Sequence, residues 1–243
     1  MASKFFLRRQ AETTPISPTP DAGWEDSSSI VRCNLRLVTS GDSHADVTIT
    51  EATSTDKDCA ARQYVCVLAA GQTVTGSQAV QFVARFQETT TSNNMHSVFG
   101  IRVIASNGTT VRKTVLAVTR EANEMVASPT ALTNRNNTAT SAATNYTTVD
   151  GDCLVVEIGA GGDPAGANPH TYAIGLGDNA AGFLAADDTT TTANNPWCQL
   201  ADTLTIYRHR LQADQGAFTA TGQGAALMNP ERFPIVVMSR ILR

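Results

Sequence analysis

The sequence predicts an all-β protein, an antiparallel, jelly-roll-like β-sandwich with an extended N-terminal arm. Threonine supplies 33 of the 243 residues, whereas only 16% of the residues are charged. This balance favours half-buried strands of β-branched residues over helices held by surface ion pairs. At least eight apolar or alternating segments are typical of strands, and no segment of crossover-helix length lies between them. The pattern therefore favours one antiparallel sandwich over an α/β fold, and 42% hydrophobic content is enough for a full core.

The N-terminal 29 residues predict the arm. Residues 11–29, AETTPISPTPDAGWEDSSS, hold three of the nine prolines together with Ser, Thr and acidic residues. Such a composition buries too little apolar surface to fold alone. We expect residues 1–29 either to be held by a neighbouring subunit or to pack back on their own domain as an edge strand. The expected anchors are Phe5, Phe6, Leu7 and Trp24.

Residues 30–243 are expected to form a single β-sandwich domain that includes a C-terminal strand. Apolar and polar residues alternate in VRCNLRL from residue 31, with the period of two expected when one face of a sheet meets the core. Asn107-Gly108 separates two β-type runs and is the strongest hairpin signal in the chain. The run CLVVEIGA (153–160) indicates a strong strand, and FPIVVMSRIL (233–242) an apolar terminal one.

Charge and cysteine content restrict the partners and the compartment. The net charge is −4, and residues 136–207 contain eight acidic residues and no Lys or Arg, so this region should repel nucleic acid. No apolar run is long enough for a membrane helix, and the first ten residues do not resemble a secretory signal. The five cysteines form no CxxC pair, which fits synthesis in a reducing cytoplasm. Of the 18 basic residues only three are lysine, and arginine is the residue that protein interfaces prefer.

No catalytic residue, cofactor or metal site is predicted, and we expect no enzyme activity. The four histidines are scattered without zinc-site spacing, and the chain has no GxSxG, P-loop or dinucleotide fingerprint. Two possibilities stay open at this point. Asp150 with Asp152, or Asp187 with Asp188, could hold calcium or simply form solvated turns. Glu157 and Asp178 could degrade a glycan, which would require both carboxylates in one cleft.

Four segments between residues 72 and 207 form an ordered pattern: GSQAVQFVARFQETTTSNNMHSVFGIRVIASNGTTVRKTVL, YTTVDGDCLVVEIGA, YAIGLGDNA and DTTTTANNPWCQL. This pattern, which we call the phage-like pattern, resembles that of a group of tailed-bacteriophage virion structural proteins, and the resemblance covers residues 72–207. Its most specific part is the order G-D-x-L-V-V-E-I-G, then G-D, then D-x-T-T-x-x-N-N-P-W. The resemblance implies a particle component without known chemistry.

We therefore expect a structural virion subunit that decorates the capsid or stabilises the particle, made in the host cytoplasm and located in the virion. Its expected partners are other virion proteins and copies of itself, with no nucleic acid and no membrane. It would clamp its neighbours through the arm and through the C-terminal strand, so that deleting residues 1–29 leaves the sandwich folded. The tail residues assigned to this clamp are Phe233, Ile235, Val237 and Ile241.

The alternative function is a carbohydrate-binding module for host recognition. In this reading Trp197 and Tyr172 would stack on a sugar, as aromatic rings do in sugar-binding sandwiches. Trp197 follows a polar loop and enters a strand, a position that also suits a plug at the end of the core.

Overall fold

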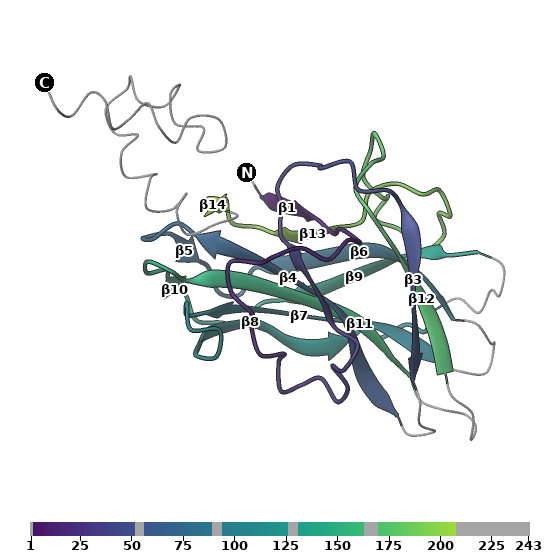
Figure 1. Ribbon diagram of the computed structural model, residues 1–243, viewed down its shortest axis with the longest axis horizontal. Coiled ribbons are helices and arrows are strands. Elements are labelled where there is room, and N and C mark those ends of the chain that lie inside the picture. Colours follow the sequence, from purple (N-terminus) through teal and green to yellow (C-terminus); the bar gives the residue numbers. More distant parts are fainter. Residues whose placement is uncertain (1, 52–55, 89–93, 126–130, 163–169, 208–243) are drawn as a thin grey trace, which may run out of the picture.

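The computed structural model (Figure 1) describes five stretches of the chain. They are residues 2–51, 56–88, 94–125, 131–162 and 170–207. The expected C-terminal strand and its residues Phe233, Ile235, Val237 and Ile241 lie outside these stretches. All regular structure in the described residues is β, which confirms the predicted all-β sandwich.

Two six-stranded sheets form the sandwich. Sheet A has the order β1-β13-β6-β12-β3, with β9 on the other side of β6. Its strands are β1 (Ser3–Phe6), β3 (Ala45–Glu51), β6 (Ala79–Glu88), β9 (Thr133–Thr140), β12 (His170–Leu176) and β13 (Trp197–Leu200). Sheet B has the order β14-β4-β11-β7-β8, with β2 also paired to β4. Its strands are β2 (Val31–Asn34), β4 (Lys57–Leu68), β7 (Met95–Ile104), β8 (Val111–Arg120), β11 (Cys153–Gly162) and β14 (Ile206–Tyr207).

The remaining strands and the pairing directions agree with an antiparallel plan. Strands β5 (Thr73–Val74) and β10 (Tyr146–Thr147) form a small separate ladder. Among the named strands of the described residues, β2 with β4 is the one parallel pair. The hairpin predicted at Asn107-Gly108 is confirmed between β7 and β8, where Gly108 has a φ of 76°. Gly108 suits this turn because glycine tolerates left-handed backbone. The Asn107 side chain stabilises the turn by accepting hydrogen bonds from the amides of Thr109 and Thr110.

The core lies between the facing sides of the two sheets. Phe82 on β6 stacks on Phe99 on β7, with ring centroids 5.2 Å apart. Tyr64 on β4 and Tyr172 on β12 are fully buried in the same cluster. Because side chains alternate along a strand, the intervening residues of β4, β7 and β11 face away from this core. Those outward residues of sheet B are nevertheless buried, since the N-terminal segment crosses over them (Figure 1).

The N-terminal residues are part of the sandwich. Strand β1 pairs with β13 at the edge of sheet A, from Ser3 opposite Leu200 to Phe6 opposite Trp197. Phe5 is fully buried in the shared core. Of the two arrangements expected for the arm, the structure therefore shows the one in which it returns to its own domain as an edge strand.

Gly159, the last residue of the motif G-D-x-L-V-V-E-I-G, lies where two strands approach closely. It follows a register shift between β11 and β4, and a Cβ at this position would lie 1.9 Å from the backbone oxygen of Cys59. Any side chain would push the two central strands apart. Glycine is required here because two backbones approach closely. The described part of the chain contains no helix of the length and hydropathy that would cross a membrane.

Candidate functional site

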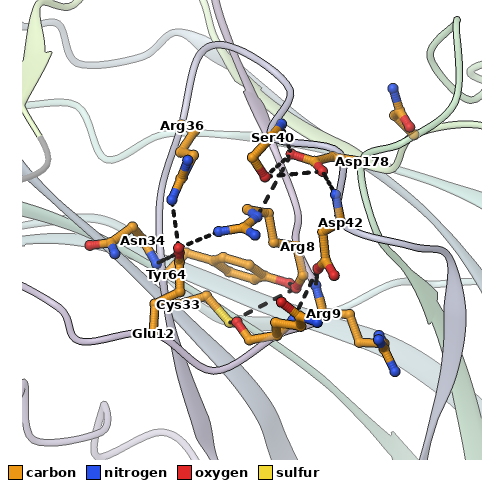
Figure 2. A network of polar contacts seen from close by, with 12 residues as sticks. Arg8, Arg9, Glu12, Cys33, Asn34, Arg36, Ser40, Asp42, Tyr64 and Asp178 are labelled. Atoms are coloured by element: carbon orange, nitrogen blue, oxygen red, sulfur yellow. Dashed lines mark hydrogen bonds and ion pairs between the residues drawn. The ribbon is translucent and has the colours of Figure 1, made fainter.

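The most elaborate polar site joins the N-terminal segment to the loops beside both sheets (Figure 2). Asp178, which follows β12, is fully buried and accepts hydrogen bonds from the amides of Ser40 (2.7 Å) and Asp42 (2.6 Å). The Asp42 carboxylate in turn accepts from the amides of Arg9 (2.7 Å) and Gln10 (3.0 Å). The Asp178 carboxylate thus orders residues 40–42, and the Asp42 carboxylate fixes the arm to that loop. We call residues Arg8, Arg9, Gln10, Glu12, Ser40, Asp42 and Asp178 the arm lock.

Arginine side chains neutralise the carboxylates of the arm lock. The guanidinium of Arg8 is buried, forms an ion pair with Glu12 and lies 3.8 Å from Asp178. Arg36 contacts the same Glu12 carboxylate at 2.5 Å, and the amide of Asn34 donates to its other oxygen. Burial raises the pKa of the Glu12 carboxyl, but the contacts with Arg8, Asn34 and Arg36 outweigh burial, so that its pKa lies below the ordinary value.

The lowered pKa of Glu12 predicts a pH-dependent contribution to folding. A carboxyl whose pKa falls on folding stabilises the protein above its unfolded pKa, about 4.3, and this contribution is lost as pH falls through the folded pKa. Glu12→Gln should therefore be less stable than the native chain at pH 7, with a gap that closes below about pH 4. Urea unfolding between pH 3 and 7 measures the gap. Glu25→Gln, at an exposed carboxylate of the arm, is the control, and a gap that does not change with pH would contradict the assignment.

Three further side chains bind the backbone carbonyls of the arm. The Tyr64 hydroxyl donates to Arg8 O at 2.7 Å, and Arg62 Nε donates to Arg9 O at 3.3 Å. The Cys33 thiol donates to Gln10 O, and burial raises its pKa to about 12. Cys33 is therefore a neutral donor rather than a nucleophile.

A second polar cluster lies on the outer face of sheet B, beneath the arm. Glu157 on β11 forms an ion pair with Arg102 on β7 at 2.9 Å and accepts from Gln63 on β4 at 2.6 Å. The same carboxylate accepts from the Trp24 indole at 3.1 Å and from the amide of Asp21 at 3.2 Å. We call these five residues the Glu157 cluster. It ties three strands to the arm, and both charges are almost completely buried.

Apolar contacts of the arm flank the Glu157 cluster on either side. On one side Ile16 packs against a patch that includes Val65 and Val155. On the other side Trp24 packs against Ala60 and Val98. The arm therefore closes the outer face of sheet B with two apolar contacts and a charged cluster between them.

A loop between β12 and β13 covers the outer face of sheet A in a similar way. The Asn195 side chain exchanges two hydrogen bonds with the backbone of Ala180, and the Trp197 indole donates to Leu184 O at 2.9 Å. Phe183 meets the Trp197 ring edge-on. Lys4 Nζ lies 3.6 Å from the centre of the Trp197 ring, so a cation–π contact closes this face.

The four arm residues predicted to contact partners are buried within their own chain. Phe5 and Leu7 are in the core, Phe6 stacks on Phe183 at 4.8 Å, and Trp24 belongs to the Glu157 cluster. None of these four anchors presents its apolar surface to a neighbour in this conformation.

The two rings assigned to sugar stacking are also inaccessible. Trp197 is 3% exposed beneath Lys4 and Phe183. Tyr172 is fully buried, and its hydroxyl donates to Cys59 O at 3.1 Å. The rings lie on opposite faces of sheet A, since Tyr172 faces the core and Trp197 packs in the outer cluster with Val83 and Leu184. They do not form a common sugar platform.

The candidate acidic pairs serve turns and cross-links. Glu157 lies on β11 of sheet B and Asp178 in the loop after β12, and the two carboxylates take part in separate polar networks. Asp152 accepts from the Val149 amide and the Tyr146 hydroxyl. Asp187 and Asp188 accept from Thr190 and from Asn136 across to β9. Within the described residues, no group of three or more His, Cys, Asp or Glu side chains is arranged to hold a metal.

Comparisons with known proteins give no family. No protein-family model and no curated protein matches the sequence. Among solved structures, a CocE/NonD family hydrolase from Staphylococcus aureus matches with a TM-score of 0.40 and 10% identity, over 79% of this chain and 37% of that chain. The VP2 subviral particle of infectious bursal disease virus matches with a TM-score of 0.20 and 13% identity, over 78% and 43% of the two chains. The chain thus spans less than half of either structure, and similarities this low support no conclusion about function.

Proposed function

We propose that this protein is a structural subunit of a tailed-bacteriophage virion that decorates the capsid or stabilises the particle. Its role would be mechanical rather than catalytic, with other virion proteins as its partners. The sequence resemblance over residues 72–207 supports the family, and the positions of the residues that carry this resemblance support the role.

One observation carries the proposal: the polar and aromatic residues of the phage-like pattern are the cross-links of the sandwich. Glu157 ties sheet B to the arm, and Asp178 anchors the arm lock. Asp188 joins the outer loop to β9. Asn195 and Trp197 close the same loop over sheet A. These residues hold the loops and the arm to the sheets, as expected in a rigid structural subunit.

The structure changes how such a subunit would contact its neighbours. The arm anchors are used inside their own chain, so the proposal assigns the arm to the stability of the sandwich. Attachment to the particle then falls to the C-terminal residues Phe233, Ile235, Val237 and Ile241, as proposed from their apolar sequence.

Reconstitution on particles tests the proposed function. Purified protein added to virions assembled without it should bind to saturation at a fixed copy number, measured by quantitative mass spectrometry after density-gradient purification. A chain ending at Tyr207 is the matched variant and should stay unbound. Failure of the full chain to bind, together with its absence from native purified particles, would contradict the proposal.

A further inference from the structure

Strand β3 ends the strand order of sheet A in the described stretches. It pairs with β12 over seven consecutive residues without a register shift, from Ala45 opposite Leu176 to Glu51 opposite His170. In the part of the chain that the structure describes, no backbone hydrogen bond joins the other side of β3 to another segment. Figure 1 shows the strand beside β12. The backbone groups of β3 on the side away from β12 are therefore available to a further strand.

Three other described edge strands are covered or irregular. At β1, the amide of Phe6 donates to Arg36 O. At β9, the amide of Asn134 donates to Thr190 O of the outer loop. Strand β8 departs from regular pairing with β7 at three places, and such bulges discourage the addition of a strand. Strand β3 lacks each of these protections and contains no Lys, Arg or Pro.

The residues of β3 are complementary to a second, antiparallel copy of the same strand. Asp46, Thr48 and Thr50 are exposed on its outer face, whereas Val47 and Ile49 pack against the core. With a two-fold axis through Thr48, Val47 lies opposite Ile49 of the partner subunit. Asp46 lies opposite Thr50 of the partner subunit, so no like charges meet. A shift of the axis to Asp46 would place two carboxylates directly opposite, and a one-residue slip would exchange core and solvent faces.

We propose that the protein forms a two-fold dimer in which β3 pairs antiparallel with β3 of a second copy, centred on Thr48. Sheet A then continues from one subunit into the other. The half-buried Val47, which packs on the core cluster, gains a β-branched neighbour across the boundary. This is the closed, isologous arrangement most common among homo-oligomers. It concerns the isolated chain and does not depend on attachment to a particle.

Light scattering across a concentration series tests the dimer. The native full chain should show twice the 25.7 kDa mass of one chain. Thr48→Lys places two ammonium groups opposite each other across the interface and should raise the dissociation constant by about tenfold or more. Thr114→Lys, at an exposed position of β8, is the matched control and should leave the dimer intact. A native chain that stays monomeric, a larger ring, or a dimer unaffected by Thr48→Lys would overturn the proposal.

A cysteine at the axis tests the register. All five native cysteines are buried, so a new exposed cysteine is the reactive one. Directly opposite residues of antiparallel strands have Cβ atoms about 4.5–5.5 Å apart, close enough for a disulfide after small adjustment. Thr48→Cys should give a covalent dimer under mild oxidation, and Thr109→Cys in the β7–β8 turn should not. Equal cross-linking of both variants, or none of Thr48→Cys, would overturn the register.

Discussion

A chain that lacks residues 1–29 is expected to lose cooperative folding. Phe5 and Leu7 are fully buried in the core shared by both sheets. Loss of one such side chain costs about 2–5 kcal/mol, and the stability of a whole domain is only about 5–15 kcal/mol. The truncation also uncovers the outer face of sheet B and leaves Glu157 and Arg102 without the arm. Near-ultraviolet circular dichroism and thermal unfolding should show no native transition.

Loss of folding in the truncated chain would contradict the sequence-based expectation that the sandwich folds without residues 1–29. Removal of Met1 and Ala2 alone, which precede β1, is the control and should preserve the transition. The single substitution Leu7→Ala should lower the free energy of unfolding by about 2–5 kcal/mol. Thr13→Ala, at an exposed arm position, should change it by less than about 0.5 kcal/mol. An unaltered midpoint for the truncated chain would show that the arm is dispensable for folding.

The second large effect is expected from Glu157→Ala. The substitution removes the buried carboxylate that pairs with Arg102 and leaves only the more distant, partly exposed Asp21 carboxylate at 3.7 Å. Removing one partner of a buried ion pair costs about 3–5 kcal/mol. It also removes the acceptor of the Trp24 indole and of the Asp21 amide, so the arm should loosen from sheet B. Urea unfolding measures the stability loss, and fluorescence quenching of Trp24 reports the loosening.

Replacing both charged residues distinguishes the cost of a buried charge without its partner from the cost of lost packing. In Glu157→Leu with Arg102→Met, no buried charge is left alone, and an apolar pair of similar size can be as stable as the ion pair it replaces. We expect the double variant to recover most of the lost stability while the arm stays loosened. A double variant less stable than Glu157→Ala would contradict an origin in the loss of the buried partner of Arg102.

Local patterns were sufficient to predict the main strands and the class of fold. The run CLVVEIGA forms the first eight residues of β11 (Cys153–Gly162), because a strand buried on both faces has a continuous apolar sequence. Asn107-Gly108 became the β7–β8 turn because its backbone preference is a property of the two residues themselves.

Pairings distant in sequence could not be predicted in the same way. Strand β1 is four residues long, and it pairs with Trp197–Leu200 near the other end of the described chain. Nothing in SKFF specifies that partner. Trp197 was expected to bind a sugar or to plug the core end, but a loop that folds over sheet A covers its ring. Burial of this kind depends on tertiary structure rather than on local sequence.

Two lone charges in apolar strands are the signal of the Glu157 cluster in the sequence. Glu157 lies within CLVVEIGA, and Arg102 lies within GIRVI, so each is a lone charge inside an apolar strand. A charge in such a position requires a buried partner of opposite sign or hydrogen-bond donors. The register that brings β7, β11 and β4 side by side decides which partner it meets, and that register is a property of the folded sheet.

Hydrogen exchange of the N-terminal amides tests most directly whether the arm is part of its own sandwich. In the isolated chain at low concentration, the amides of Arg9 and Gln10 should exchange slowly, since both donate to the Asp42 carboxylate. The amide of Asp21 should be protected by Glu157 and should lose that protection in Glu157→Ala. Exchange of all three at the rate of an unstructured peptide would contradict the account, because the arm would then not be held by its own domain.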